Sequence, residues 1–182
     1  MEAVAGLRID PASPKLVDIL PRAFEASINA HKNEISRLKA SEDPFSWEQI
    51  YTEYKQLARV HRAVSELPGL ASIAPSIKVA NYDREVRDAR GQAANAHYKF
   101  GLLLIQDMMR EPNMKQQRKA AHAFKRALEL IPGYEDAEAR YERARKNGTK
   151  RVAIFPFEDK SGRARRYGAM ADIIVDEMTV AL

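Results

Sequence analysis

The stretch AANAHYKFGLLLIQDMMREPNMKQQRKAAHAFKRALELIP, residues 93–132, contains two helical patterns separated by a break. In both patterns apolar residues recur at steps of three and four, which is the spacing of one buried helical face. The break falls at Pro112, and Pro132 ends the second pattern, because proline interrupts the hydrogen bonds of a helix. The stretch therefore predicts two helices, at about 82–110 and 115–130, that pair as an antiparallel hairpin.

The first of these helices has an interior that changes from small to bulky residues. We expect its buried face to comprise Ala89, Ala93, Ala96, Phe100, Leu103, Leu104 and Met108. Gly91 and Gly101 also lie inside it, and each costs about 1 kcal/mol relative to alanine in an exposed helix. Glycine at these positions predicts the close approach of another helix.

Helical periodicity also covers the residues N-terminal to this hairpin. One apolar stripe runs from about residue 16 to residue 35, and Pro14 suits the first turn of its helix. We expect Pro21 to kink this helix or to move its start later. A second helix follows, and Ser46 is its predicted N-cap. Gln49 lies three residues later, so each of the two side chains can bond the backbone N–H of the other residue.

Three aromatic residues, Trp47, Tyr51 and Tyr54, fall on one face of this second helix. Steps of four and three place them in a single stripe, which favours a position in the core. The alternative is an exposed recognition patch, because tryptophan and tyrosine are effective anchors at interfaces.

The sequence pattern changes after residue 148. Residues 152–157, VAIFPF, form a short, continuous apolar run that is typical of a buried strand. A polar loop then leads to an amphipathic helix at about 168–182. Strand, loop and helix are the opening of an α/β unit. We therefore predict a mainly α chain, with a helical domain at 1–148 and the beginning of a truncated α/β domain at 149–182.

The composition narrows the possible functions. The chain has 182 residues and no cysteine, which excludes disulfides, thiol catalysis and cysteine-rich zinc sites. No apolar run approaches the length of about 18 residues that a membrane-spanning helix requires. No two histidines share a helix at metal-ligand spacing; they are His31, His61, His97 and His122. We predict no metal, no cofactor, no small-molecule substrate and no catalytic residue, and therefore a protein that is not an enzyme.

Within residues 93–132 the small and aromatic residues form an ordered series. The series is Ala93, Ala96, Phe100, Gly101 and Leu104, followed by Ala120, Phe124, Ala127, Leu128 and Pro132. It resembles the tetratricopeptide repeat, in which small residues let two helices cross closely and a proline closes each pair. The second half has the family spacing, whereas the first half needs about seven extra residues between the helices. Closing prolines at 11, 68 and 132 are 57 and 64 residues apart, so the resemblance implies long, irregular repeats.

This resemblance implies a binding site as well as a fold. In tetratricopeptide proteins the inner face of the first helix of each pair lines a concave groove that accepts a peptide or another protein. The corresponding positions here are Asn95, Tyr98, Leu102 and Ile105. Asn95 can bond a peptide backbone, and Tyr98 offers apolar area with a polar tip. The alternative is that Leu102 and Ile105 pack on the preceding hairpin.

A second resemblance covers residues 150–182. The segment KRVAIFPFEDKSG at 150–162, followed by Tyr167-Gly168 and a helix, is similar to the start of the curli-secretion lipoprotein family and of the related N-terminal domain of the Tol-system periplasmic protein. It implies a bacterial envelope protein on the periplasmic side. We expect the chain to be a fragment cut inside this domain, with membrane association through a lipid anchor upstream of residue 1.

The positive charge of the chain is concentrated near its C-terminal end. Residues 140–166 contain 10 basic and 3 acidic side chains, including Arg163, Arg165 and Arg166. Two functions therefore stay open. The first is a non-catalytic scaffold of a bacterial envelope assembly that binds another protein in its helical groove. The alternative is a binder of an anionic polymer or membrane surface through residues 140–166, with nucleic acid not expected.

Overall fold

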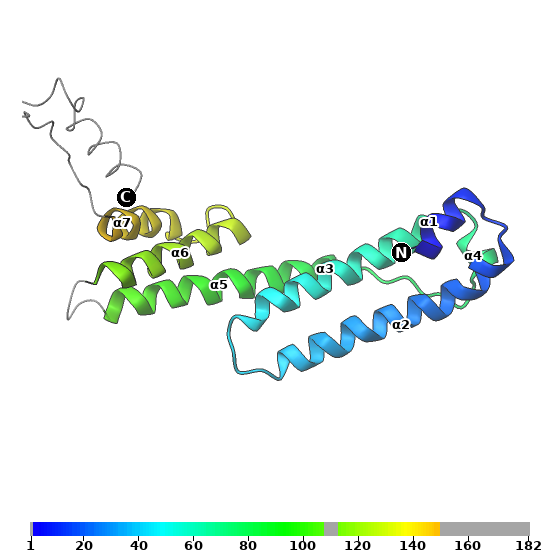
Figure 1. Cartoon of the computed structure of the whole chain (residues 1–182), viewed down its shortest axis with the longest axis horizontal. Coiled ribbons are helices and arrows are strands. Elements are labelled where there is room, and N and C mark those ends of the chain that lie inside the picture. Colours follow the sequence, from blue (N-terminus) through cyan, green and yellow to red (C-terminus); the bar gives the residue numbers. More distant parts are fainter. Residues whose placement is uncertain (1, 108–112, 150–182) are drawn as a thin grey trace, which may run out of the picture. The chain divides into compact units, whose positions relative to one another are not determined.

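A computed structural model of the chain describes residues 2–107 and 113–149, which form seven helices and no strand within those ranges (Figure 1). The helices are α1 (Glu2–Ile9), α2 (Pro14–Lys39), α3 (Ser46–Ser65), α4 (Leu70–Ile73), α5 (Asp83–Asp107), α6 (Met114–Leu130) and α7 (Ala137–Gly148). The prediction of a mainly α protein is confirmed for this part. The predicted strand at 152–157 and helix at 168–182 lie outside the described residues, so the α/β domain stays a prediction.

The long helices pack against one another antiparallel and in chain order. α2 packs on α3, α3 on α5, α5 on α6, and α6 on α7, while the short α1 packs on α2 (Figure 1). Between α4 and α5 the extended segment 74–82 returns the chain along α3, where the Ala80 N–H donates to Nδ1 of His61. No helix among the described residues combines the length and apolar composition of a bilayer span.

Bulky side chains fill the interface between α2 and α3. The buried members are Ile28, Ile35, Leu38, Ile50 and Leu57. Trp47, Tyr51 and Tyr54 pack against this cluster, so their predicted position in the core is confirmed. α2 begins at Pro14, and Pro21 lies inside it without moving its start. A proline in a helix removes one backbone donor, and Leu20 and Ile28 of the same helix are buried.

The start of α3 differs from the predicted cap. Phe45, not Ser46, is the N-cap residue, and it makes no side-chain capping bond. The turn is instead fixed by Asp43, whose carboxylate accepts from the Phe45 N–H at 2.9 Å and whose carbonyl accepts from the Ser46 N–H at 3.0 Å. Ser46 is consequently the first helical residue and is buried.

Small residues form most of the interface among α5, α6 and α7. The buried set around one large side chain, Phe124, comprises Ala120, Ala121, Ala137 and Ala144. A Cβ atom added to Gly101 would lie 2.7 Å from the Phe124 ring, so the predicted close approach at this glycine is confirmed. The same prediction is wrong for Gly91, where an added Cβ would meet nothing within 4 Å. A side chain at Gly91 would therefore face open space.

Candidate protein-binding surface on α5

Three of the four predicted groove residues take part in the interior of the α5–α7 region. Tyr98, Leu102 and Ile105 are half-buried and pack against the cluster around Phe124. Leu102 and Ile105 thus pack against the helices that follow α5. These side chains hold α6 and α7 against α5.

The hydroxyl of Tyr98 already has a partner in the chain. It donates to the carboxylate of Asp136 at 2.5 Å, and the Arg140 guanidinium lies 6.0 Å from the centre of the Tyr98 ring. The bond to Asp136 raises the pKa of Tyr98 above its ordinary value. The Arg140 guanidinium, together with Tyr98, lowers the pKa of Asp136. The polar tip of Tyr98 therefore fixes the turn before α7.

Asn95 differs from the other three predicted residues. It is half-buried on α5, and its carboxamide makes no hydrogen bond to another described residue. A carboxamide has two donors and one acceptor. Asn95 therefore keeps its capacity to bond a partner's backbone, and its role as a binding residue stays a prediction.

An ion network that the sequence did not reveal connects α3, α5 and α6. The carboxylate of Glu48 lies 2.7 Å from Nε2 of His97 and accepts from Nε of Arg126 at 3.0 Å. Arg126 also donates to Glu129 at 2.7 Å. The hydrogen bonds from Arg126 are the main reason why the pKa of Glu48 is lowered. The three helices are thereby held in a fixed register by partly buried charges.

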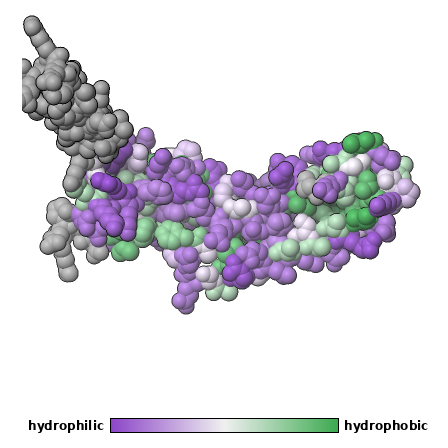
Figure 2. All heavy atoms as spheres, viewed as in Figure 1, coloured by the Kyte–Doolittle hydropathy of each residue, from purple (hydrophilic) through white to green (hydrophobic). Residues whose placement is uncertain are grey.

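Two apolar side chains beside this network stay exposed. Phe100 is 37% exposed and Leu103 is 61% exposed, although the sequence predicted both in the interior of the helix. The Phe45 ring meets Phe100 edge to face at 5.3 Å and meets His97 at 5.0 Å. Residues three apart on a helix share a face. We call Phe45, Phe100 and Leu103 the Phe100 surface, and Figure 2 shows apolar side chains gathered along the C-terminal part of α5.

The remaining candidate groups are placed as follows. Among residues 2–107 and 113–149 no three acidic or histidine side chains form a group suited to a metal ion. Arg163, Arg165 and Arg166 lie outside the described part of the chain. The chain matches no protein-family model, no curated protein and no solved structure.

Proposed function

We propose that this chain is a non-catalytic, tetratricopeptide-like scaffold that binds a partner protein through the Phe100 surface. The observation that carries the proposal is the exposure of Phe100 and Leu103 on α5, the helix whose His97 lies 2.7 Å from the carboxylate of Glu48 on α3. Apolar area on a rigid element binds a partner with little loss of conformational freedom.

The packing of α5 on α6 supports the comparison with tetratricopeptide hairpins. The absence of a side chain at Gly101 leaves room for the Phe124 ring. The small Ala120 and Ala127 are fully buried on the facing helix. α7 then packs on α6 as the first helix of a following pair would do. Short repeated helical pairs expose long surfaces for partners.

The energetics of the Phe100 surface fit a protein partner. Complete burial of a leucine or phenylalanine side chain contributes about 1.5–3 kcal/mol relative to exposure. The Phe45 ring, which itself contacts His97, packs edge to face on the Phe100 ring, so a partner meets a ring that already has a neighbour holding it. Aromatic anchors of this kind are enriched among the residues that dominate interface energies.

The cellular setting of the proposal is the bacterial envelope, on the periplasmic side. Its support is the resemblance of residues 150–162 to envelope lipoproteins. The alternative function, in which the basic residues at 140–166 bind an anionic surface, is weakened at two of these residues, because Arg140 and Arg145 bond to Asp136 and Glu142.

Site-specific photo-crosslinking in the bacterium that carries the gene tests the proposal. A photoreactive residue at Leu103 is expected to form a discrete protein adduct, and Leu103→Asp is expected to abolish binding of the partner so identified. The matched control places the same photoreactive residue at Lys119, which is exposed on α6. Equal adducts from both positions, or unchanged binding of the Leu103→Asp variant, would overturn the proposal.

A further inference from the structure

A second surface lies on α3, near the opposite end of α5. Side chains from α1, α3 and the start of α5 enclose a groove of about 650 Å³. We call it the α3 groove, and its charged members are Arg8, Lys55, Arg59, Arg62, Glu66 and Asp83. Asp83 is about 30 Å along α5 from Leu103, at 1.5 Å per residue, so the α3 groove and the Phe100 surface are separate.

The carboxylates in the α3 groove are paired, whereas two of its cations are not. Glu66 accepts from Arg8 at 2.8 Å, and Asp83 lies 3.7 Å from Arg62. Lys55 and Arg59 are exposed and have no carboxylate partner among the described residues. The Nζ atom of Lys55 instead lies 5.2 Å from the centre of the Tyr51 ring. Two positive charges therefore stay available in the groove.

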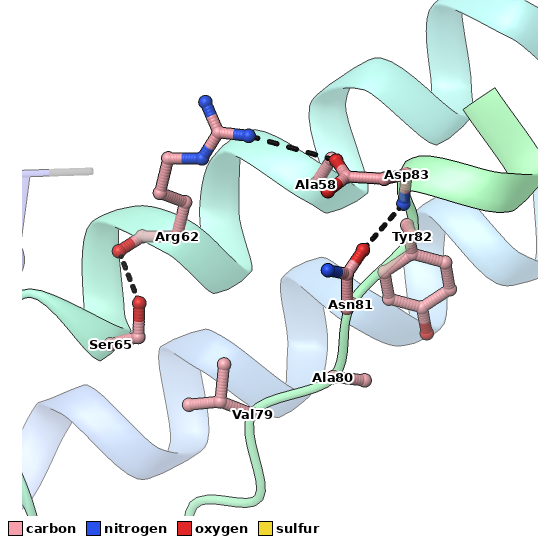
Figure 3. A pocket seen from close by; sticks show the side chains of 8 residues that line it. All are labelled: Ala58, Arg62, Ser65, Val79, Ala80, Asn81, Tyr82 and Asp83. Atoms are coloured by element: carbon pink, nitrogen blue, oxygen red, sulfur yellow. Dashed lines mark hydrogen bonds and ion pairs between the residues drawn. The ribbon is translucent and has the colours of Figure 1, made fainter. Parts of the chain in front are cut away.

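A smaller pocket of about 310 Å³ continues the groove at Arg62 and Asp83 (Figure 3). The figure shows Arg62 reaching from α3 toward Asp83, and the Asn81 carboxamide accepting from the Asp83 N–H at 2.7 Å. The extended segment 79–81 forms one wall of the pocket, and the Val79 side chain on it is 42% exposed. The α3 groove is therefore lined by basic side chains, and the adjoining pocket adds one exposed apolar side chain, that of Val79.

We propose that the α3 groove binds an acidic, extended peptide segment of a partner protein. The free cations at positions 55 and 59 lie one helical turn apart, on the same face as Arg62. Carboxylates along an extended peptide meet such a row without bending the chain. The groove spans the twelve residues from Lys55 to Glu66, about 16 Å, which is the length of about five extended peptide residues.

The resident carboxylates favour a peptide over a uniform polyanion. Glu66 and Asp83 sit inside the groove, and both would repel a row of phosphates. A peptide carries backbone N–H donors between its acidic side chains, and these donors suit carboxylate acceptors. The apolar side chain of Val79 gives an aliphatic peptide residue a contact that a nucleic acid backbone does not use. The acidic peptide is proposed for a site separate from the Phe100 surface, and this proposal does not depend on binding at that surface.

Fluorescence anisotropy of the whole chain with a fluorescein-labelled hexapeptide, EEVEEV, tests this inference. We expect saturable binding and at least about a tenfold weaker affinity for the double variant Lys55→Glu/Arg59→Glu, because two attractive contacts become repulsive. The control double variant Lys15→Glu/Lys119→Glu reverses two exposed charges elsewhere, has comparable net charge, and is expected to bind as the unaltered chain does.

A neutral variant guards against misfolding of the reversed one. Lys55→Gln/Arg59→Gln removes both charges but keeps unbranched polar side chains, and it is expected to weaken binding by about threefold to tenfold with an unaltered circular dichroism spectrum. Binding of EEVEEV by both groove variants within twofold of the unaltered chain would overturn the inference. Tighter binding of a short oligothymidylate, or of phosphatidylglycerol vesicles, than of the peptide would overturn it as well.

Discussion

The interface between α2 and α3 and the interface among α5, α6 and α7 solve the same packing problem differently. The first spreads burial over several bulky residues, such as Ile35, Ile50 and Leu57. The second surrounds one large side chain, Phe124, with alanines and Gly101. Small residues bring helices close together, and the space that remains then suits only one ring. The α5–α7 interface therefore depends on few atoms, whereas the α2–α3 interface shares its stabilisation among many.

Truncation of Phe124 gives the largest expected effect. The side chain is 0% exposed, and Phe124→Ala should lower the free energy of unfolding by about 3–5 kcal/mol, because the alanines around it cannot fill the cavity. Ile50→Ala, also at a fully buried position, should cost only about 2–3 kcal/mol, since bulky neighbours can shift into the space. Urea denaturation followed by circular dichroism measures both. A larger loss for Ile50→Ala would show that burial is not concentrated at Phe124.

The two glycines of α5 provide a matched pair at the next level. Gly101→Ala places a Cβ atom 2.7 Å from the Phe124 ring, and we expect a loss of about 1–3 kcal/mol from overpacking. Gly91→Ala meets no atom within 4 Å and should stabilise the protein by up to about 1 kcal/mol through helix propensity. Thermal unfolding of the two variants side by side gives the comparison. Equal shifts in the midpoint would contradict a close helix crossing at Gly101.

The positions of α2, α3, α5 and α6 were predictable from the sequence, whereas α1 and the short α4 were not, and the reason for the success is local. Apolar spacing together with the prolines at 14, 112 and 132 depends on residues within one or two turns. The exposure of Phe100 and Leu103 was not predictable, because the face that α5 turns to its neighbours is decided by helices distant in the chain. The charges of Glu48 and Arg126 meet across 78 residues, and no local pattern indicates such a pair.

The candidate binding residues show the same division. The tetratricopeptide spacing assigned Tyr98, Leu102 and Ile105 to a groove, which stays a prediction, and it did not indicate that they pack against the cluster around Phe124. The turn before α7 places Asp136 against Tyr98, and that contact depends on the loop geometry after Leu130. Sequence periodicity indicates which residues share a helical face. The neighbouring helices decide which of those residues stay exposed.

Charged groups also contribute to stability in the two regions, and Glu48 is the first example. The Arg126 guanidinium lowers the pKa of Glu48, so its contribution is present above the unfolded pKa, near 4.3, and is lost as the pH falls through the lower folded value. Glu48→Gln should cost about 1–2 kcal/mol at pH 7 and less as the pH falls toward 3. Glu142→Gln, at an exposed pair, should change little at either pH. Denaturation curves at both pH values test this, and a pH-independent loss for Glu48→Gln would refute it.

The smallest predicted effect belongs to His61, on the α2–α3 side. Burial, with the charge of Lys32 adding to it, lowers the pKa of His61, and Nδ1 must be unprotonated to accept from the Ala80 N–H. The unfolded state, with a pKa near 6.5, takes up the proton first as the pH falls. The stabilisation from neutral His61 is therefore present above the unfolded pKa near 6.5 and is lost as the pH falls. The free energy of unfolding should decrease by about 0.5 kcal/mol between pH 7 and pH 6.

His61→Phe should remove this slope, although it leaves the Ala80 N–H without its acceptor. The control His122→Gln, at an exposed position on α6, should keep the slope. Hydrogen exchange at the Ala80 amide locates the effect, because its protection factor should fall between pH 7 and pH 6 while protection of the Phe124 amide stays constant. If both amides lose protection together, the two interfaces unfold as one unit. The α2–α3 and α5–α7 interfaces would then differ in how their side chains pack but not in local stability.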